Sequence, residues 1–141
     1  MMATFNKVNC LVADMANKVH NFGSDTIKLM LTNVAPTATS AVKTDITEIA
    51  AGNGYTAGGN VCALTSSSQT AGLYKLILAN PATWTAVGGA IATFRYAVVY
   101  NDTAVSKNVI GYWDYASPVT LAAGETFTAS LDATNGVIQL Q

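Results

Sequence analysis

Apolar residues recur every three or four positions near the start of the chain and every second position further along. Over residues 5–19 the polar positions separate an apolar set made of Phe5, Val8, Leu11, Val12, Met15 and Val19. This spacing predicts one amphipathic helix over about residues 5–20, ending near residues 21–24. Such a helix either covers one face of a sheet or docks onto a partner.

Beyond residue 25 the apolar period becomes two. Ile27, Leu29 and Leu31 alternate with Lys28, Met30 and Thr32, which predicts a half-buried strand. Turn residues separate further short apolar segments at 61–65, 73–79, 94–100, 109–115, 119–121, 127–131 and 137–140. Even spacing of this kind fits a sandwich or a barrel. We expect a mainly β fold: an antiparallel, jelly-roll-like β-sandwich of about seven to eight strands over about residues 25–140, with one N-terminal helix.

The length of the chain fits one domain, residues 1–141. No window approaches the about 18 to 20 uninterrupted apolar residues of a membrane-spanning helix, so we expect a soluble protein that does not enter a membrane. Polar residues interrupt the first 21 positions, and no basic segment precedes an apolar one. We therefore expect no secretory signal, and we expect synthesis in the cytoplasm.

Charged residues make up only 11% of the chain, against about 25% in typical soluble domains. None occurs within residues 49–74, 76–94, 115–124 or 133–141. Either hydroxyl and amide groups solvate this surface, or neighbouring subunits cover much of it, and we favour the second reading. The net charge of −1 and the scattered basic residues argue against nucleic-acid binding.

Candidate catalytic and metal-binding side chains are few. Cys10 and Cys62 form no CxxC pair, and His20 is the only histidine. We expect two free thiols, no metal and no cofactor. A nucleophilic triad would need His20 with Asp14 or Asp25, and nothing in the sequence favours that geometry. The chain is therefore predicted not to be an enzyme.

The glycine-rich segment 52–60 is the strongest turn signal. Its first six residues formally match the dinucleotide fingerprint G-x-G-x-x-A. A strand should precede that fingerprint and a helix should follow it, and neither is predicted here. We interpret Gly54, Gly58 and Gly59 as a structural turn with positive φ angles.

Segments 94–100 and 109–115 are predicted to pair across a loop centred on Ala104 and Val105. That register places Arg95 opposite Asp114 and Tyr96 opposite Trp113, which predicts a structural ion pair and an aromatic pair. A structural role for the ion pair is favoured over ligand binding. The face that carries it is expected to hold Ala97, Val99, Ile110 and Tyr112.

Several segments together carry a resemblance that covers nearly the whole chain. They read KVHNFGSDTIK (18–28), DITEI (45–49), GYTAGG (54–59), FRYAVVYND (94–102), IGYWDY (110–115) and GETFT (124–128). The chain resembles a family of small tailed-bacteriophage virion structural proteins.

The resemblance implies a β-sandwich on the capsid surface, made in the host cytoplasm, that acts as a decoration or cement protein. Its partners would be the major capsid protein and copies of itself, in a homo-oligomer. The candidate contact regions are the N-terminal helix and the uncharged segments 49–74 and 76–94. A tail- or fibre-associated receptor-binding module is the alternative, and aromatic side chains on the strands leave glycan binding open.

Overall fold

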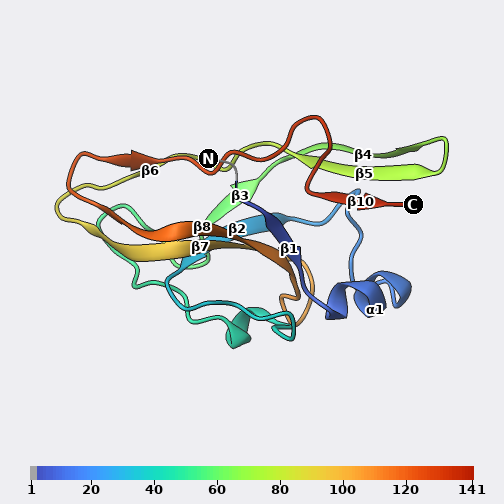
Figure 1. The fold of residues 1–141 in the computed structure, drawn as a ribbon, viewed down its shortest axis with the longest axis horizontal. Helices are drawn as coiled ribbons and strands as arrows, with labels where there is room; N and C mark the ends of the chain where they lie inside the picture. The colour runs from blue at the N-terminus through green and yellow to red at the C-terminus, as the bar shows by residue number, and fades with distance from the viewer. Residues whose placement is uncertain (1–2) are drawn as a thin grey trace.

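A five-stranded antiparallel sheet forms the middle of the molecule (Figure 1). The structure is a computed structural model that describes residues 3–141. From one edge to the other, the strands are β1 (Phe5–Lys7), β8 (Val109–Leu121), β7 (Ile91–Asn101), β2 (Ile27–Thr32) and β3 (Asn60–Cys62). β7 and β8 are the two longest strands and pair along most of their length, because the loop between them brings their ends together.

A second strand layer covers one face of this central sheet (Figure 1). It contains a three-stranded sheet in the order β10 (Ile138–Leu140), β5 (Leu73–Leu78) and β4 (Leu64–Thr70), and a separate pair of β6 (Trp84–Thr85) and β9 (Thr126–Phe127). The expected mainly β, sandwich-like fold with an N-terminal helix is confirmed. The strands are more numerous than expected, because the second layer is divided into two small sheets.

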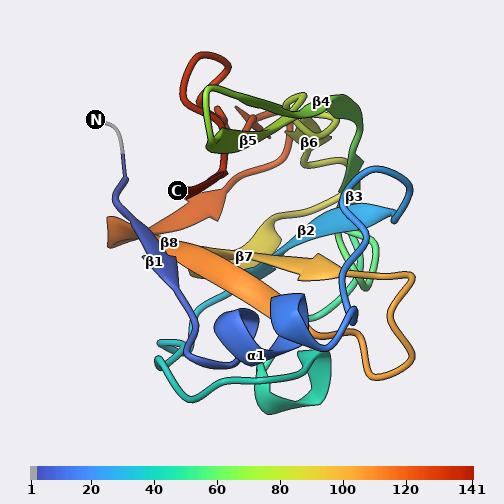
Figure 2. The ribbon, with the colours of Figure 1, turned by 90° about the vertical axis from the view of Figure 1, so that its right-hand side faces the viewer.

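Helix α1 (Cys10–Ala16), the 3-10 turn Lys43–Asp45 and the connecting loops cover the opposite face of the central sheet (Figure 2). Leu11 is the buried residue of α1, and the helix packs against β8. Of the two roles open to this helix, the structure shows that it covers the sheet.

The predicted helix over residues 5–20 is wrong at its beginning. Phe5–Lys7 forms β1, in which Phe5 pairs with Trp113 and Lys7 with Gly111. The Phe5 and Trp113 rings lie 4.9 Å apart. A three-residue strand is stabilised by such partners from the far end of the sequence, which no local periodicity reveals. Val12, expected on the apolar face of the helix, is 61% exposed.

Three strand predictions also need correction. β2 is buried on both faces, since Met30 and Thr32 are as inaccessible as Leu29. Residues 66–70, predicted as a turn, belong to β4. The predicted break at residues 117–118 is absent, because β8 continues to Leu121 through a change of register beside Ala116, which has a φ of 71°.

Buried side chains from all layers form one hydrophobic cluster, in which Trp84, Tyr100 and Phe94 are the largest fully buried residues. Within residues 3–141, the only α-helix is far too short to cross a membrane.

Candidate functional site

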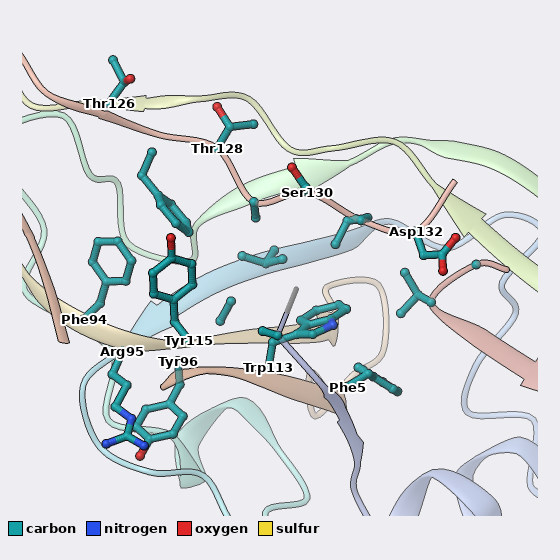
Figure 3. Close-up of a pocket in the computed structure, with 18 residues that line it drawn as sticks. Phe5, Phe94, Arg95, Tyr96, Trp113, Tyr115, Thr126, Thr128, Ser130 and Asp132 are labelled. Atoms are coloured by element: carbon teal, nitrogen blue, oxygen red, sulfur yellow. The ribbon is translucent and has the colours of Figure 1, made fainter. Parts of the chain in front are cut away.

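A cavity with a volume of about 500 Å³ lies between the central sheet and the C-terminal segment (Figure 3). We call it the aromatic groove and define it by five rings that line it: Phe5, Phe94, Trp113, Tyr115 and Phe127. A cavity of this size with a mostly apolar lining is typical of a small-molecule site.

The central sheet supplies the lower wall through a row of directly paired residues. Phe5 pairs with Trp113 and Trp113 with Ala97, and all three line the cavity. Ala97 pairs next with Leu31, which is fully buried, so the row crosses four strands. Directly paired residues of antiparallel strands point to the same face. Ala97 therefore lies between two large side chains and leaves the space above it open.

The upper wall is the extended segment that begins with β9. Thr126, Thr128 and Ser130 are exposed, whereas Phe127, Ala129 and Leu131 are partly or fully buried. This alternation is the two-residue period of extended backbone. Figure 3 shows the Thr126 and Thr128 side chains directed away from the ring of Tyr115. The groove thus receives the apolar side chains of this segment.

Aromatic contacts close one end of the groove. The Phe127 ring lies 4.9 Å from the Phe94 ring and 5.9 Å from the Tyr115 ring, edge-on to both. Tyr115 is 41% exposed and stands at the mouth. Such edge-to-face pairs hold their rings in defined positions. The walls are therefore preformed.

The predicted ion pair of Arg95 and Asp114 is present at the rim of the groove. Arg95 donates from Nε to Asp114 Oδ1 at 2.8 Å and from an amino nitrogen to Oδ2 at 2.9 Å. Arg95, and next the backbone N–H of Ala116, lower the pKa of the Asp114 carboxyl. Arg95 also lies over the Tyr96 ring, at 5.3 Å from its centroid, and Figure 3 shows both side chains directed away from Tyr115.

The register predicted for this hairpin is wrong by one residue. Asp114 is directly opposite Tyr96, and Trp113 is opposite Ala97, so the predicted pair of Tyr96 and Trp113 does not form across the ladder. The Trp113 ring packs against the Phe5 ring instead, with the two planes tilted by 52°. The cause is a series of register shifts in β7 and β8, which a loop assumed to be symmetric cannot reveal.

The predicted face of the ion pair changes with the register. Tyr112 lies two residues before Asp114 on β8, so it shares the face of the ion pair. Ala97 and Val99 belong to the groove side, where they pair with Trp113 and Gly111. Ile110 lies at a register shift, since Val99 pairs with Gly111 and Tyr100 with Val109.

The predicted turn residues Gly54, Gly58 and Gly59 all have positive φ angles, at 102°, 92° and 72°. A side chain on Gly59 would collide with the carbonyl oxygen of Leu29, so this position requires glycine. The Gly58 N–H donates to Glu48. This turn fastens its loop to the central sheet and does not line the groove.

A second polar cluster surrounds His20. Asn101 donates from its side-chain nitrogen to His20 Nδ1 at 3.0 Å and to Asp25 at 2.6 Å, and His20 Nε2 lies 3.8 Å from Asp14 Oδ2. Burial lowers the pKa of His20, while Asp14 and Asp25 oppose that effect. The ring is neutral at pH 7 and acts as an acceptor for Asn101.

The two cysteines are free thiols, as predicted. Burial is the main cause that raises the pKa of Cys10 to about 11 and that of Cys62 to about 12. Both therefore stay protonated at neutral pH, which is unfavourable for nucleophilic or ligating thiolates. No group of three or more His, Cys, Asp and Glu side chains suited to a metal ion occurs in the described part of the chain.

The sequence pattern does not group Phe5, Phe94 and Phe127 with Trp113 and Tyr115. It places Phe5 in a helix, and Phe127 lies on a strand whose partner, β6, it does not predict. Comparisons with known proteins add no further assignment: no family model, curated protein or solved structure matches this chain.

Proposed function

We propose that this chain is a bacteriophage virion structural protein that decorates the capsid and binds the major capsid protein and copies of itself. The observation that carries the proposal is an uncharged stretch of chain that forms two exposed sheet edges. Residues 49–74 contain no charged residue and no proline. Within them, β3 is one edge of the central sheet and β4 is one edge of the three-stranded sheet.

Exposed strand edges usually carry lysine, proline or other features that prevent pairing with a second chain. Here two hydrophobic side chains are exposed on those edges: Val61 on β3 is 49% exposed, and Leu64 on β4 is 43% exposed. Depletion of charge together with exposed apolar residues is typical of the core of a protein–protein interface. We infer that other virion subunits cover these edges.

A decoration role also fits the small size of each contact surface. Two short strand edges give modest affinity, but a capsid presents many equivalent positions, and contacts between neighbouring copies add to the binding. We expect no catalytic activity, because the thiols are protonated and the His20 side chain is buried away from solvent and from the groove.

The experiment is the copy number of the chain in purified particles that contain it, measured by quantitative mass spectrometry against the major capsid protein. We expect a copy number comparable to that of the major capsid protein. A handful of copies per particle would contradict decoration.

Matched variants then test the uncharged edges on particles that lack the protein. Val61→Lys and Leu64→Lys should reduce occupancy, because each places a charge in the proposed interface. Ala133→Lys, a change at an exposed position outside residues 49–74, should saturate the particles like the unmodified chain. Equal occupancy by all three variants would reject these edges as the contact surface.

The aromatic groove favours a second candidate, a tail- or fibre-associated binding module. Such a module would use an exposed aromatic-lined groove to contact a ligand or receptor, and Tyr115 at the mouth is accessible for that contact. The same copy-number measurement separates the two, since a tail module predicts few copies.

A further inference from the structure

The aromatic groove is preformed but not filled by the side chains of residues 3–141. Small residues line it where a sandwich interior normally holds large ones: Ala97 on the lower wall, Ala129 on the upper wall and Gly136 beyond it. We propose that the groove is a binding site for a flat, uncharged, apolar molecule that carries an oxygen acceptor. This proposal goes beyond virion attachment and concerns the isolated protein.

The first argument is charge. Arg95 is the cation at the rim, and its Nε and one amino nitrogen both donate to Asp114. Asp132, also at the rim, accepts hydrogen bonds from the backbone N–H groups of Asn135 and Thr134, which lower the pKa of its carboxyl. The charged groups of the lining are thus paired or hydrogen-bonded. An anionic ligand would lose its hydration without gaining a free cation, and the Asp132 carboxylate is exposed at the rim, outside the apolar interior where a ligand ring would lie.

The second argument is the shape of the apolar surface. Trp113, Tyr115 and Phe127 present large rings, and Ala97 and Ala129 leave a gap between the walls. Rings that are already fixed by edge-to-face contacts bind another flat apolar body with little loss of side-chain entropy. This geometry favours a planar ligand over a flexible chain.

The third argument is the position of two hydrogen-bond donors. The Tyr115 hydroxyl and the Trp113 indole N–H belong to side chains that line the groove. Trp113 is partly buried and Tyr115 stands at the mouth, so both are accessible to a ligand in the groove. A carbonyl or ether oxygen on the ligand would accept from one of them.

A sugar fits this site less well. Sugar binding needs several polar partners for the ligand hydroxyls, because polar groups buried without partners are costly. The threonine side chains of the upper wall, Thr126 and Thr128, point away from the ring of Tyr115 (Figure 3). The interior of the groove is formed by rings and by aliphatic groups such as Leu131 and Val137.

The experiment is a fluorescence titration of the intact protein with Nile red, an uncharged planar dye that carries a carbonyl oxygen. We expect saturable binding of one dye per chain. Ala97→Phe fills the gap and should weaken binding at least tenfold. Val87→Phe adds the same ring at an exposed position outside the groove and should bind like the unmodified protein. Equal binding by Ala97→Phe and the unmodified protein would overturn the proposal.

A second variant preserves the test if Ala97→Phe does not fold. Tyr115→Phe keeps the ring and removes only the hydroxyl, so Nile red affinity should fall about threefold to tenfold, the range for one net hydrogen bond. Pyrene, which is planar and has no oxygen, should bind both proteins equally. An unchanged Nile red affinity would reject the proposed hydrogen bond from Tyr115 to an oxygen acceptor on the ligand. Competition by millimolar glucose or galactose would overturn it in favour of a sugar site.

Discussion

Arg95 donates two hydrogen bonds to Asp114, although the strand ladder places Tyr96 directly opposite Asp114. A register shift between Phe94 and Tyr96 makes this possible, because it turns the Arg95 side chain to the face that carries Asp114. The Ala116 N–H completes the site by donating to Asp114 Oδ1 at 2.8 Å. The carboxylate therefore joins the two strands at the point where their pairing is irregular.

Replacing Arg95 should raise the pKa of Asp114. In Arg95→Gln the largest cause of the lowered pKa is gone, and the Ala116 N–H retains part of the effect. A carboxyl whose folded pKa is lowered stabilises the fold above its unfolded pKa and loses that contribution as the pH falls through the folded value. The variant should therefore show a smaller loss of stability on acidification.

The measurement is an NMR pH titration of the Asp114 carboxyl carbon in both proteins. Arg95→Lys is the matched control, because it keeps the charge but cannot form the two parallel hydrogen bonds, and its Asp114 pKa should be intermediate. An identical pKa in all three proteins would show that Arg95 does not control this carboxyl.

Removing the Tyr55 hydroxyl should destabilise the fold. This group accepts from the backbone N–H of Leu31 at 3.0 Å and donates to Glu48 at 2.7 Å. Tyr55→Phe leaves a buried N–H of β2 without an acceptor, which costs about 1–3 kcal/mol. Urea denaturation measures the free energy of unfolding. Tyr112→Phe, which changes a partly exposed ring, should shift it by less than about 0.5 kcal/mol, and equal losses in both variants would contradict the assigned role.

Stability should fall as His20 is forced to take up a proton. The folded pKa is lowered from its ordinary value of 6.5, chiefly by burial, and protonated Nδ1 would face the amide nitrogen of Asn101, itself a donor. Between the two pKa values the unfolded chain binds more protons than the folded chain. The free energy of unfolding therefore decreases as the pH is lowered from the unfolded pKa to the folded pKa. Above the unfolded pKa the contribution of His20 is constant and fully present.

Urea midpoints measured between about pH 5 and 8, where histidine titrates, give this slope. His20→Gln should flatten it whatever its effect on absolute stability, because glutamine does not titrate. A slope that persists in His20→Gln would assign the pH dependence to groups other than His20.

The turn between β4 and β5 should accept asparagine with a gain in stability. Ala71 and Gly72 have φ angles of 51° and 84°, the two positive values that a two-residue hairpin turn of type I′ requires. Alanine is strained there and asparagine is favoured. Ala71→Asn should raise the free energy of unfolding by about 0.5–1 kcal/mol, measured by thermal unfolding. Gly72→Ala should lower it, and a loss in both variants would contradict this turn type.

Local pattern determined much of the fold. The alternation at Ile27, Leu29 and Leu31 placed β2, and the turn signals at Gly54, Gly58 and Gly59 placed the loop that closes on it. Opposite charges at Arg95 and Asp114 identified the ion pair even though the assumed register was wrong, because the register shift between Phe94 and Tyr96 turns the Arg95 side chain to the face of Asp114. These features depend on the pattern of neighbouring residues or on the sign of a charge, and the sequence contains both kinds of information.

The groove was decided by the tertiary structure alone. Phe5 reaches Trp113 across more than a hundred residues, and Ala97 creates a space only because it lies between Trp113 and Leu31 in one cross-strand row. Short strands such as β1, β6 and β9 have too few residues to show a period, so long-range pairing determines where they form. The sequence thus determined a β fold with few charged residues and long uncharged segments. Which aromatic rings share one cavity depends on register shifts and on the packing of two sheets, which a linear pattern does not contain.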